Sequence, residues 1–152
     1  MTDLHVHDID IARYLFGEPD AISCRATTSV CRHDSVHTSL FYGNTPITAI
    51  GDWTVGIPFH ANCRVDFERA TVTLEGSTKL TVYPKDGTAA YAIPIESISG
   101  QESELAYFCD VINGKIKNEK NPPISAATTI RLVEHLRKSA DANGVITPFC
   151  AQ

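Results

Sequence analysis

The hydrophobic pattern of the chain changes period twice, and this change constrains the fold more than any other feature. Residues 3–17 carry apolar side chains at helical spacing, residues 22–95 alternate between apolar and polar positions, and helical spacing returns at residue 103. Alternation is the pattern of strands, whereas recurrence every three or four residues is that of amphipathic helices. The sequence therefore predicts one helix, a series of strands and two closing helices.

The alternating region divides into about seven short runs separated by turn residues. The predicted strands are residues 22–30, 36–42, 47–55, 62–67, 70–75, 80–82 and 91–95, with residues 145–147 as a further edge strand. The connections are too short for crossover helices, so successive strands are expected to pair antiparallel. The predicted class is α+β: an open, mainly antiparallel sheet with helices packed on one face.

Two helices are predicted to close the chain. The first runs from Ser103 to Asn113 and ends at Gly114. The second is longer, with Ser125 as its expected N-cap and Asn143-Gly144 as its end.

Bulk properties exclude several classes of protein. The length of 152 residues suits one domain, and the net charge of −5 comes without Lys or Arg clusters, which argues against nucleic acid and anionic membranes as partners. No apolar run is long enough to span a bilayer. The cysteines number five and show no C-x-x-C spacing, so we expect free thiols in the cytoplasm. Neither G-x-G-x-x-G nor G-x-x-x-x-G-K occurs, so a dinucleotide would have to bind elsewhere.

The opening helix has two distinct faces. The offsets of four, three and four residues place Asp3, His7, Asp10 and Tyr14 along one side. The opposite apolar arc is expected to pack on the core and comprises Leu4, Ile9, Ile11, Ala12, Leu15 and Phe16. Asp8 falls inside this arc, where first-turn capping is the only role that the pattern offers. A stripe of carboxylates, imidazole and phenol is therefore predicted on the solvent side.

The segment Asp3-x-x-x-His7-Asp-Ile-Asp10, followed by Tyr14-Leu-Phe-Gly-Glu-Pro19, resembles the opening of the C-terminal domain of the Gfo/Idh/MocA oxidoreductases. These are relatives of glucose–fructose oxidoreductase and inositol dehydrogenase. Residues 104–114 and 130–145 look like the closing helices of that family. The resemblance implies a domain like the C-terminal one of glyceraldehyde-3-phosphate dehydrogenase (GAPDH-like), whose open sheet binds substrate and often mediates oligomerisation.

The resemblance also implies how the chain would work. Residues 1–152 would be a single C-terminal substrate-binding domain, a homo-oligomer such as a dimer through its sheet face. The N-terminal Rossmann domain, which carries NAD or NADP and a catalytic lysine in the family, would be absent. The parent protein would be an NAD(P)-dependent dehydrogenase acting on a sugar or polyol hydroxyl. This chain alone is expected to bind no nicotinamide cofactor and to be inactive.

The family roles can be carried over onto matching positions. His7 would be the acid/base that exchanges a proton with the reacting hydroxyl, since an imidazole titrates near neutral pH. Asp3 would hold that hydroxyl or orient the imidazole, and Asp10 and Tyr14 would be further substrate contacts. Trp53 is predicted at a core position in the third strand, and stacking on a sugar face is the alternative.

Three other interpretations remain open from the residues. Asp3, His5 and His7 also match the D-x-H-x-H opening of metal-dependent hydrolases, in which a strand points both imidazoles at a metal. A non-catalytic dimerisation or ligand-holding module is a second alternative. A third is a zinc site, although its ligands lack finger-like spacing and scattered side chains are expected instead: Cys31, His33, His37, His60 and Cys63.

Overall fold

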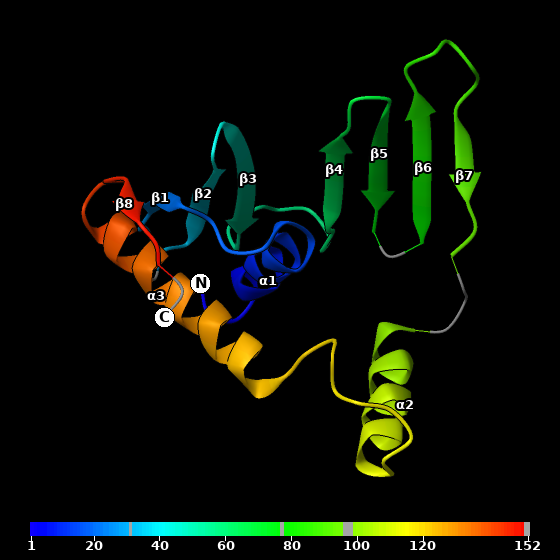
Figure 1. Ribbon diagram of the computed structural model, residues 1–152. Coiled ribbons are helices and arrows are strands. Elements are labelled where there is room, and N and C mark those ends of the chain that lie inside the picture. The colour runs from blue at the N-terminus through cyan, green and yellow to red at the C-terminus, as the bar shows by residue number, and fades with distance from the viewer. Residues whose placement is uncertain (31, 77, 96–98, 151–152) are drawn as a thin grey trace. The chain divides into compact units, whose positions relative to one another are not determined.

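The computed structural model describes residues 1–30, 32–76, 78–95 and 99–150 (Figure 1). The elements in chain order are α1 (His5–Phe16), β1 (Ala21–Thr27), β2 (Ser35–Tyr42), β3 (Thr45–Asp52), β4 (Asn62–Asp66), β5 (Ala70–Glu75), β6 (Lys79–Pro84), β7 (Tyr91–Ile93), α2 (Gly100–Ile112), α3 (Pro123–Asp141) and β8 (Thr147–Pro148). Every described strand pairing is antiparallel. The predicted α+β class is confirmed.

The strands hydrogen-bond as two four-stranded sheets, in the orders β3-β2-β1-β8 and β4-β5-β6-β7. The chain divides into two compact units in the same way: Met1–Gly56 with Asn118–Gln152, and Ile57–Lys117. The division follows Gly56, just before Pro58, which has no N–H to donate to a strand partner. Periodicity located the strands, but a period does not identify the partner of a strand, so the pattern alone indicated one sheet.

The first unit has a core between one sheet face and two helices. Alternate residues of β1 and β2 are buried; α3 packs against β1, and α1 packs against α3 and β3. The core consists of Ile9, Ala12, Ile22, Cys24, Val36, Leu40, Leu132, Val133, Leu136 and Phe149. This placement confirms the predicted packing of helices on one sheet face. In the apolar arc predicted for α1, however, Ile11, Leu15 and Phe16 are exposed.

The helix ends differ from the predictions for local reasons. α1 begins at His5, with Leu4 as an N-cap that forms no side-chain hydrogen bond, so Asp3 lies outside the helix. α2 begins at Gly100 because Ser99 and Glu102 form a capping box. α3 begins at Pro123, so Ser125 lies within the helix and its prediction as the N-cap was wrong. A proline fits the first helical position because the N–H that it lacks has no partner there.

The third strand is shorter than predicted. β3 ends at Asp52, whose Oδ1 accepts hydrogen bonds of 2.7 Å from both the N–H and the hydroxyl of Thr54. This Asx turn ends the strand before Trp53. Trp53 is 38% exposed, so the prediction that it occupies a core position was wrong.

The second unit buries much less. Its strands β4, β5 and β6 are mostly intermediate or exposed, and no residue of α2 is buried. The apolar residues at helical spacing on α2, Leu105, Phe108 and Ile112, are all exposed. Within the described ranges, none of the helices combines the length and apolar character needed to cross a bilayer.

Candidate active site

Asp3 and His7 lie at the N-terminal end of α1. Asp3 occupies the turn that precedes the helix, and His7 is its third residue, with its backbone N–H donating to the carbonyl of Leu4 at 3.1 Å. Both residues are exposed, and among the described residues neither side chain has a hydrogen bond or ion pair. A carboxylate and an imidazole, four residues apart in the sequence, are therefore both exposed to solvent at the start of α1.

Asp10 is held by the helix that closes the chain. Its carboxylate accepts a hydrogen bond from the hydroxyl of Thr129 on α3 and lies 3.7 Å from Nη1 of Arg13. Arg13 also donates to the carbonyl of Ser125 at 3.0 Å and to Glu18. The hydrogen bond with Glu18 raises the pKa of Arg13 despite burial, which acts in the opposite direction. The side chain of Asp10 is 48% exposed, so one side remains open to a ligand while the other joins α1 to α3.

Tyr14 lies further along α1, and Trp53 comes directly after β3. Tyr14 follows His7 by two turns, about 10 Å along the helix axis, and it is 71% exposed. Trp53 follows β3, and its backbone N–H donates to the carbonyl of Asp34 at 3.0 Å. The structure thus places Asp3 and His7 at one helix end, and it does not gather all five predicted site residues into one pocket.

His5 entered the sequence analysis only as part of the D-x-H-x-H alternative, and its buried position was missed. It is fully buried, with Nδ1 2.9 Å from Oδ2 of Asp8 and Nε2 2.9 Å from Oγ1 of Thr38 on β2. Thr38 is also fully buried and reaches Sγ of Cys24 at 3.5 Å. The contact with His5 explains Asp8, the acidic residue inside the predicted apolar arc. The signal for His5 was its helical spacing from the buried residues Ile9 and Ala12.

The backbone excludes the geometry that the hydrolase interpretation requires. A D-x-H-x-H site needs alternate residues of one strand to point the same way, but residues 3–7 form a turn and the start of a helix. His5 points into the core and His7 is exposed. Both ring nitrogens of His5 already have partners, so this pair does not present two free imidazoles to one ion.

The zinc candidates do not form a ligand set where they can be located. Cys31 lies outside the described residues. His33 is buried with Nε2 3.0 Å from Asp141, His37 is exposed on β2, and Nδ1 of His60 lies 3.4 Å from the carbonyl of Pro58. The part of the chain that the structure describes holds no group of three or more His, Cys, Asp or Glu suited to a metal. The described cysteines Cys24, Cys63, Cys109 and Cys150 are free thiols.

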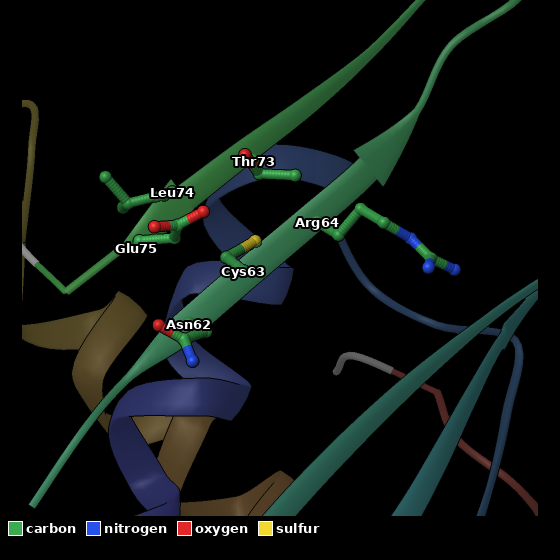
Figure 2. Close-up of a pocket in the computed structure, with 6 residues that line it drawn as sticks. All are labelled: Asn62, Cys63, Arg64, Thr73, Leu74 and Glu75. Atoms are coloured by element: carbon green, nitrogen blue, oxygen red, sulfur yellow. The ribbon is translucent and has the colours of Figure 1, made fainter. Parts of the chain in front are cut away.

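A shallow hollow on the second sheet holds none of the predicted site residues. It spans β4 and β5, as Figure 2 shows, and is lined by Asn62, Cys63, Arg64, Thr73, Leu74 and Glu75. Its charged side chains have partners: Arg64 pairs with Asp66 at 3.1 Å, and Glu75 pairs with Lys79 at 3.1 Å. The hollow therefore presents no unpaired charge to a ligand.

Comparisons with known proteins identify the fold. A family model described as the GFO/IDH/MocA C-terminal domain matches residues 1–89. No curated protein sequence matches the chain. Among solved structures, UDP-N-acetylglucosamine 3-dehydrogenase from Acidithiobacillus ferrooxidans matches with a TM-score of 0.82 and 17% identity over 92% of this chain and 46% of its own.

Two further structures show the same fold. An inositol dehydrogenase homolog from Azotobacter vinelandii, complexed with NADH and myo-inositol, has a TM-score of 0.75 and 13% identity over 97% of this chain and 49% of its own. An oxidoreductase from Agrobacterium radiobacter, in complex with NAD+, L-tartaric acid and magnesium, has a TM-score of 0.73 and 22% identity over 96% and 48%. The chain spans about half the length of these structures.

Proposed function

This chain belongs to the GFO/IDH/MocA oxidoreductases as a C-terminal domain, and we propose that it forms the substrate-binding half of an enzyme that oxidises or reduces a sugar or polyol at a hydroxyl carbon. The observation that carries the proposal is the pair Asp3 and His7, exposed and unengaged at the start of α1 within the matched segment. Similar folds include a nucleotide-sugar dehydrogenase and an inositol dehydrogenase homolog, which supports this substrate class.

Proton transfer is the part of the reaction that these residues can perform. His7 would exchange the proton of the substrate hydroxyl, and Asp3 would accept a hydrogen bond from that hydroxyl or orient the ring. Asp10 has one side open and is positioned by Thr129 and Arg13, so it suits a neighbouring hydroxyl of a polyol. Tyr14 and the half-exposed ring of Trp53 would add contacts to the sugar.

The residues of this chain do not fit a nicotinamide dinucleotide. A glycine-rich turn at the start of a helix is the usual cradle for its pyrophosphate, and no such motif occurs among these 152 residues. We therefore assign NAD or NADP to a separate dinucleotide-binding domain. On this proposal the chain alone has no turnover.

A second copy of the chain is the proposed partner of the second sheet. Tyr91 and Ile93 of β7 are 54% and 41% exposed and pair with Val82 and Leu80 of β6, so these apolar residues share one face of the sheet. Exposed apolar side chains on one face are typical of interaction sites. The free thiols of the described cysteines fit a reducing compartment such as the cytoplasm.

The direct test supplies the chain with a dinucleotide-binding domain of its family and follows nicotinamide absorbance with polyols and sugars. We expect turnover that His7→Ala abolishes and that Asp3→Asn lowers. His37→Ala is the matched control because His37 is an exposed histidine on β2, outside the proposed site. Turnover that survives His7→Ala would remove the proposed acid/base role.

A non-catalytic dimerisation module is the second candidate, favoured by the exposed apolar side chains of β6, β7 and α2. It predicts a stable dimer and no turnover with any dinucleotide-binding partner. The activity assay separates the candidates, because both predict a dimer but only the enzyme requires His7.

A further inference from the structure

The first turn of α1 is anchored by a buried imidazole. His5 and Thr38 are both fully buried, and the two ring nitrogens of His5 each lie 2.9 Å from a partner, Oδ2 of Asp8 and Oγ1 of Thr38. A buried polar group without partners is strongly destabilising, so an imidazole persists there only because both nitrogens are satisfied. These contacts join the start of α1 to β2, a strand more than thirty residues away in sequence.

The sheet is shaped to receive this ring. A Cβ built on Gly51 of β3 would lie 2.9 Å from Nδ1 of His5 and 3.3 Å from its Cβ and Cγ. Gly51 pairs with Val36, two residues before Thr38 on β2. The glycine therefore leaves the space and Thr38 supplies the polar partner, so two adjacent strands accommodate one side chain of α1.

The partners also determine where the protons lie. The carboxylate of Asp8 only accepts hydrogen bonds, so Nδ1 of His5 carries a proton. In the neutral ring, Nε2 is then an acceptor and the hydroxyl of Thr38 donates to it. The hydroxyl of Thr38 also lies 3.5 Å from the sulfur of Cys24 on β1. Asp8, Thr38 and Cys24 are the polar groups in this chain of contacts, and Gly51 of β3 adds none.

We propose that His5 is a positioning residue for His7, acting through Asp8 and Thr38. The N-cap of α1 provides no side-chain hydrogen bond, so the contacts of His5 supply the polar anchor of the turn that carries His7. His7 follows His5 by two residues and is exposed, so the buried imidazole fixes the backbone from which the exposed one projects. The assignment of His7 to a reaction rests on the proposed function, but the anchoring does not.

Nuclear magnetic resonance of the 152-residue chain tests the anchor. We expect the nitrogen signals of His5 to show a proton on Nδ1 that exchanges slowly with water. Thr38→Val removes the partner of Nε2 and should raise amide exchange at His7 and Ile9 about tenfold or more, the scale of one lost buried hydrogen bond. Thr38→Ser keeps the hydroxyl and should restore slow exchange.

Two controls keep this test decisive. Thr48→Val makes the same substitution at an exposed position on β3 and should leave the exchange of His7 unchanged. His5→Ala should match Thr38→Val at these amides, and if it fails to fold, the Thr38 pair still carries the measurement. Unchanged exchange in Thr38→Val, or an Nδ1 without a proton, would overturn the proposal.

The catalytic consequence is measured with the dinucleotide-binding domain supplied. Thr38→Val should lower kcat about tenfold with KM within about twofold, because the anchor affects the placement of the proton-transferring group more than substrate contacts. Thr38→Ser should recover kcat, which a nonspecific loss of stability would not explain. An unchanged kcat despite faster exchange would overturn the positioning role. Absence of turnover in the wild type would reject the proposed function, while amide exchange would still decide whether the anchor holds the turn of His7.

Discussion

The two units of this chain differ in how many side chains they bury. Both contain a four-stranded antiparallel sheet and a helix with an amphipathic pattern, yet among the described residues only Thr81 and Val82 are buried in the second unit. In the first unit, α3 buries Leu132, Val133 and Leu136, whereas α2 buries none of its residues. The first unit can therefore hold side chains in place by packing, and the second offers mostly surface.

This difference explains why the candidate site belongs to the first unit. The accurate placement of polar groups requires neighbours that are themselves fixed by packing and hydrogen bonds. The carboxylate of Asp10 contacts Thr129 and Arg13, and His7 lies in a turn that His5 anchors to β2. In the second unit, the charged residues Arg64 and Glu75 pair with others on the surface. Surface pairs of this kind contribute little to stability.

Leu136→Ala should produce the largest effect and would test the comparison most severely. Leu136 is fully buried in the core, so its truncation should lower the free energy of unfolding by about 2–5 kcal/mol. Leu105→Ala on α2 is the matched control, since Leu105 is 63% exposed and its loss should cost less than about 0.5 kcal/mol. Urea unfolding followed by the fluorescence of Trp53 reports on the first unit, and amide exchange of α2 reports on the second. Equal losses would mean that α2 packs its apolar face against something.

Ser139→Ala tests whether buried hydrogen bonds support the first unit as strongly as its apolar core. The hydroxyl of Ser139 accepts from the backbone N–H of Cys24 at 3.0 Å and donates to the carbonyl of Val145 at 2.7 Å, tying α3 to β1 and to the chain end. Removing a buried group with two partners should cost about 1–3 kcal/mol. Ser139→Cys, a poor hydrogen-bonding substitute of similar shape, should not restore the stability. A loss below about 0.5 kcal/mol in the same urea titration would contradict this account.

The sequence predicted the strands well because alternation is a local property. Ile22, Cys24, Val36 and Leu40 all lie on the core side as their period required. Local chemistry explains the errors at the ends: the Asx turn of Asp52 shortened the third strand, and the Ser99–Glu102 capping box lengthened α2. Both the Asx turn and the capping box can be recognised in the sequence, but hydrophobic periodicity alone does not detect them.

The anchoring of the candidate site could not be predicted because it depends on contacts between distant segments. The sequence contains His5 but does not identify its hydrogen-bond partner, because Thr38 lies on β2 and meets His5 only in the fold. Likewise, Asp10 matched a family pattern, whereas its contact with Thr129 spans more than a hundred residues. The sequence therefore indicated candidate side chains for the chemistry, and the fold was needed to show which residues contact them.

Ser99→Ala should give a smaller effect, confined to the second unit. Ser99 caps α2 by accepting from the N–H of Glu102 at 3.2 Å, while Glu102 accepts from the N–H of Ser99 at 3.0 Å. Loss of such a cap typically costs about 1 kcal/mol. Amide exchange should therefore rise in the first turn of α2, with Ser99→Asp as the substitution that retains a cap. The unfolding midpoint reported by Trp53 in the first unit should not move.

Asp141→Asn should give the smallest effect. It tests whether the stability of the two units depends on acidic pH independently, as their packing differs. Hydrogen bonds from His33 and Arg32 hold the pKa of Asp141 below its usual value, so the folded state binds this proton less readily than the unfolded state. The contribution of Asp141 to the free energy of unfolding is therefore fully present above the usual aspartate pKa. It is lost as the pH falls through the lower pKa that Asp141 has in the folded state. Asp66 in the second unit has the same sign, since the hydroxyl of Thr71 lowers its pKa. Each Asn variant should make the stability of its own unit, and only that unit, depend less on pH in the acid range. Trp53 fluorescence measures this for Asp141, and amide exchange of β4 and β5 measures it for Asp66. A weaker pH dependence of both units after one substitution would show that the units unfold together, and their difference in burial would then not be a difference in independent stability.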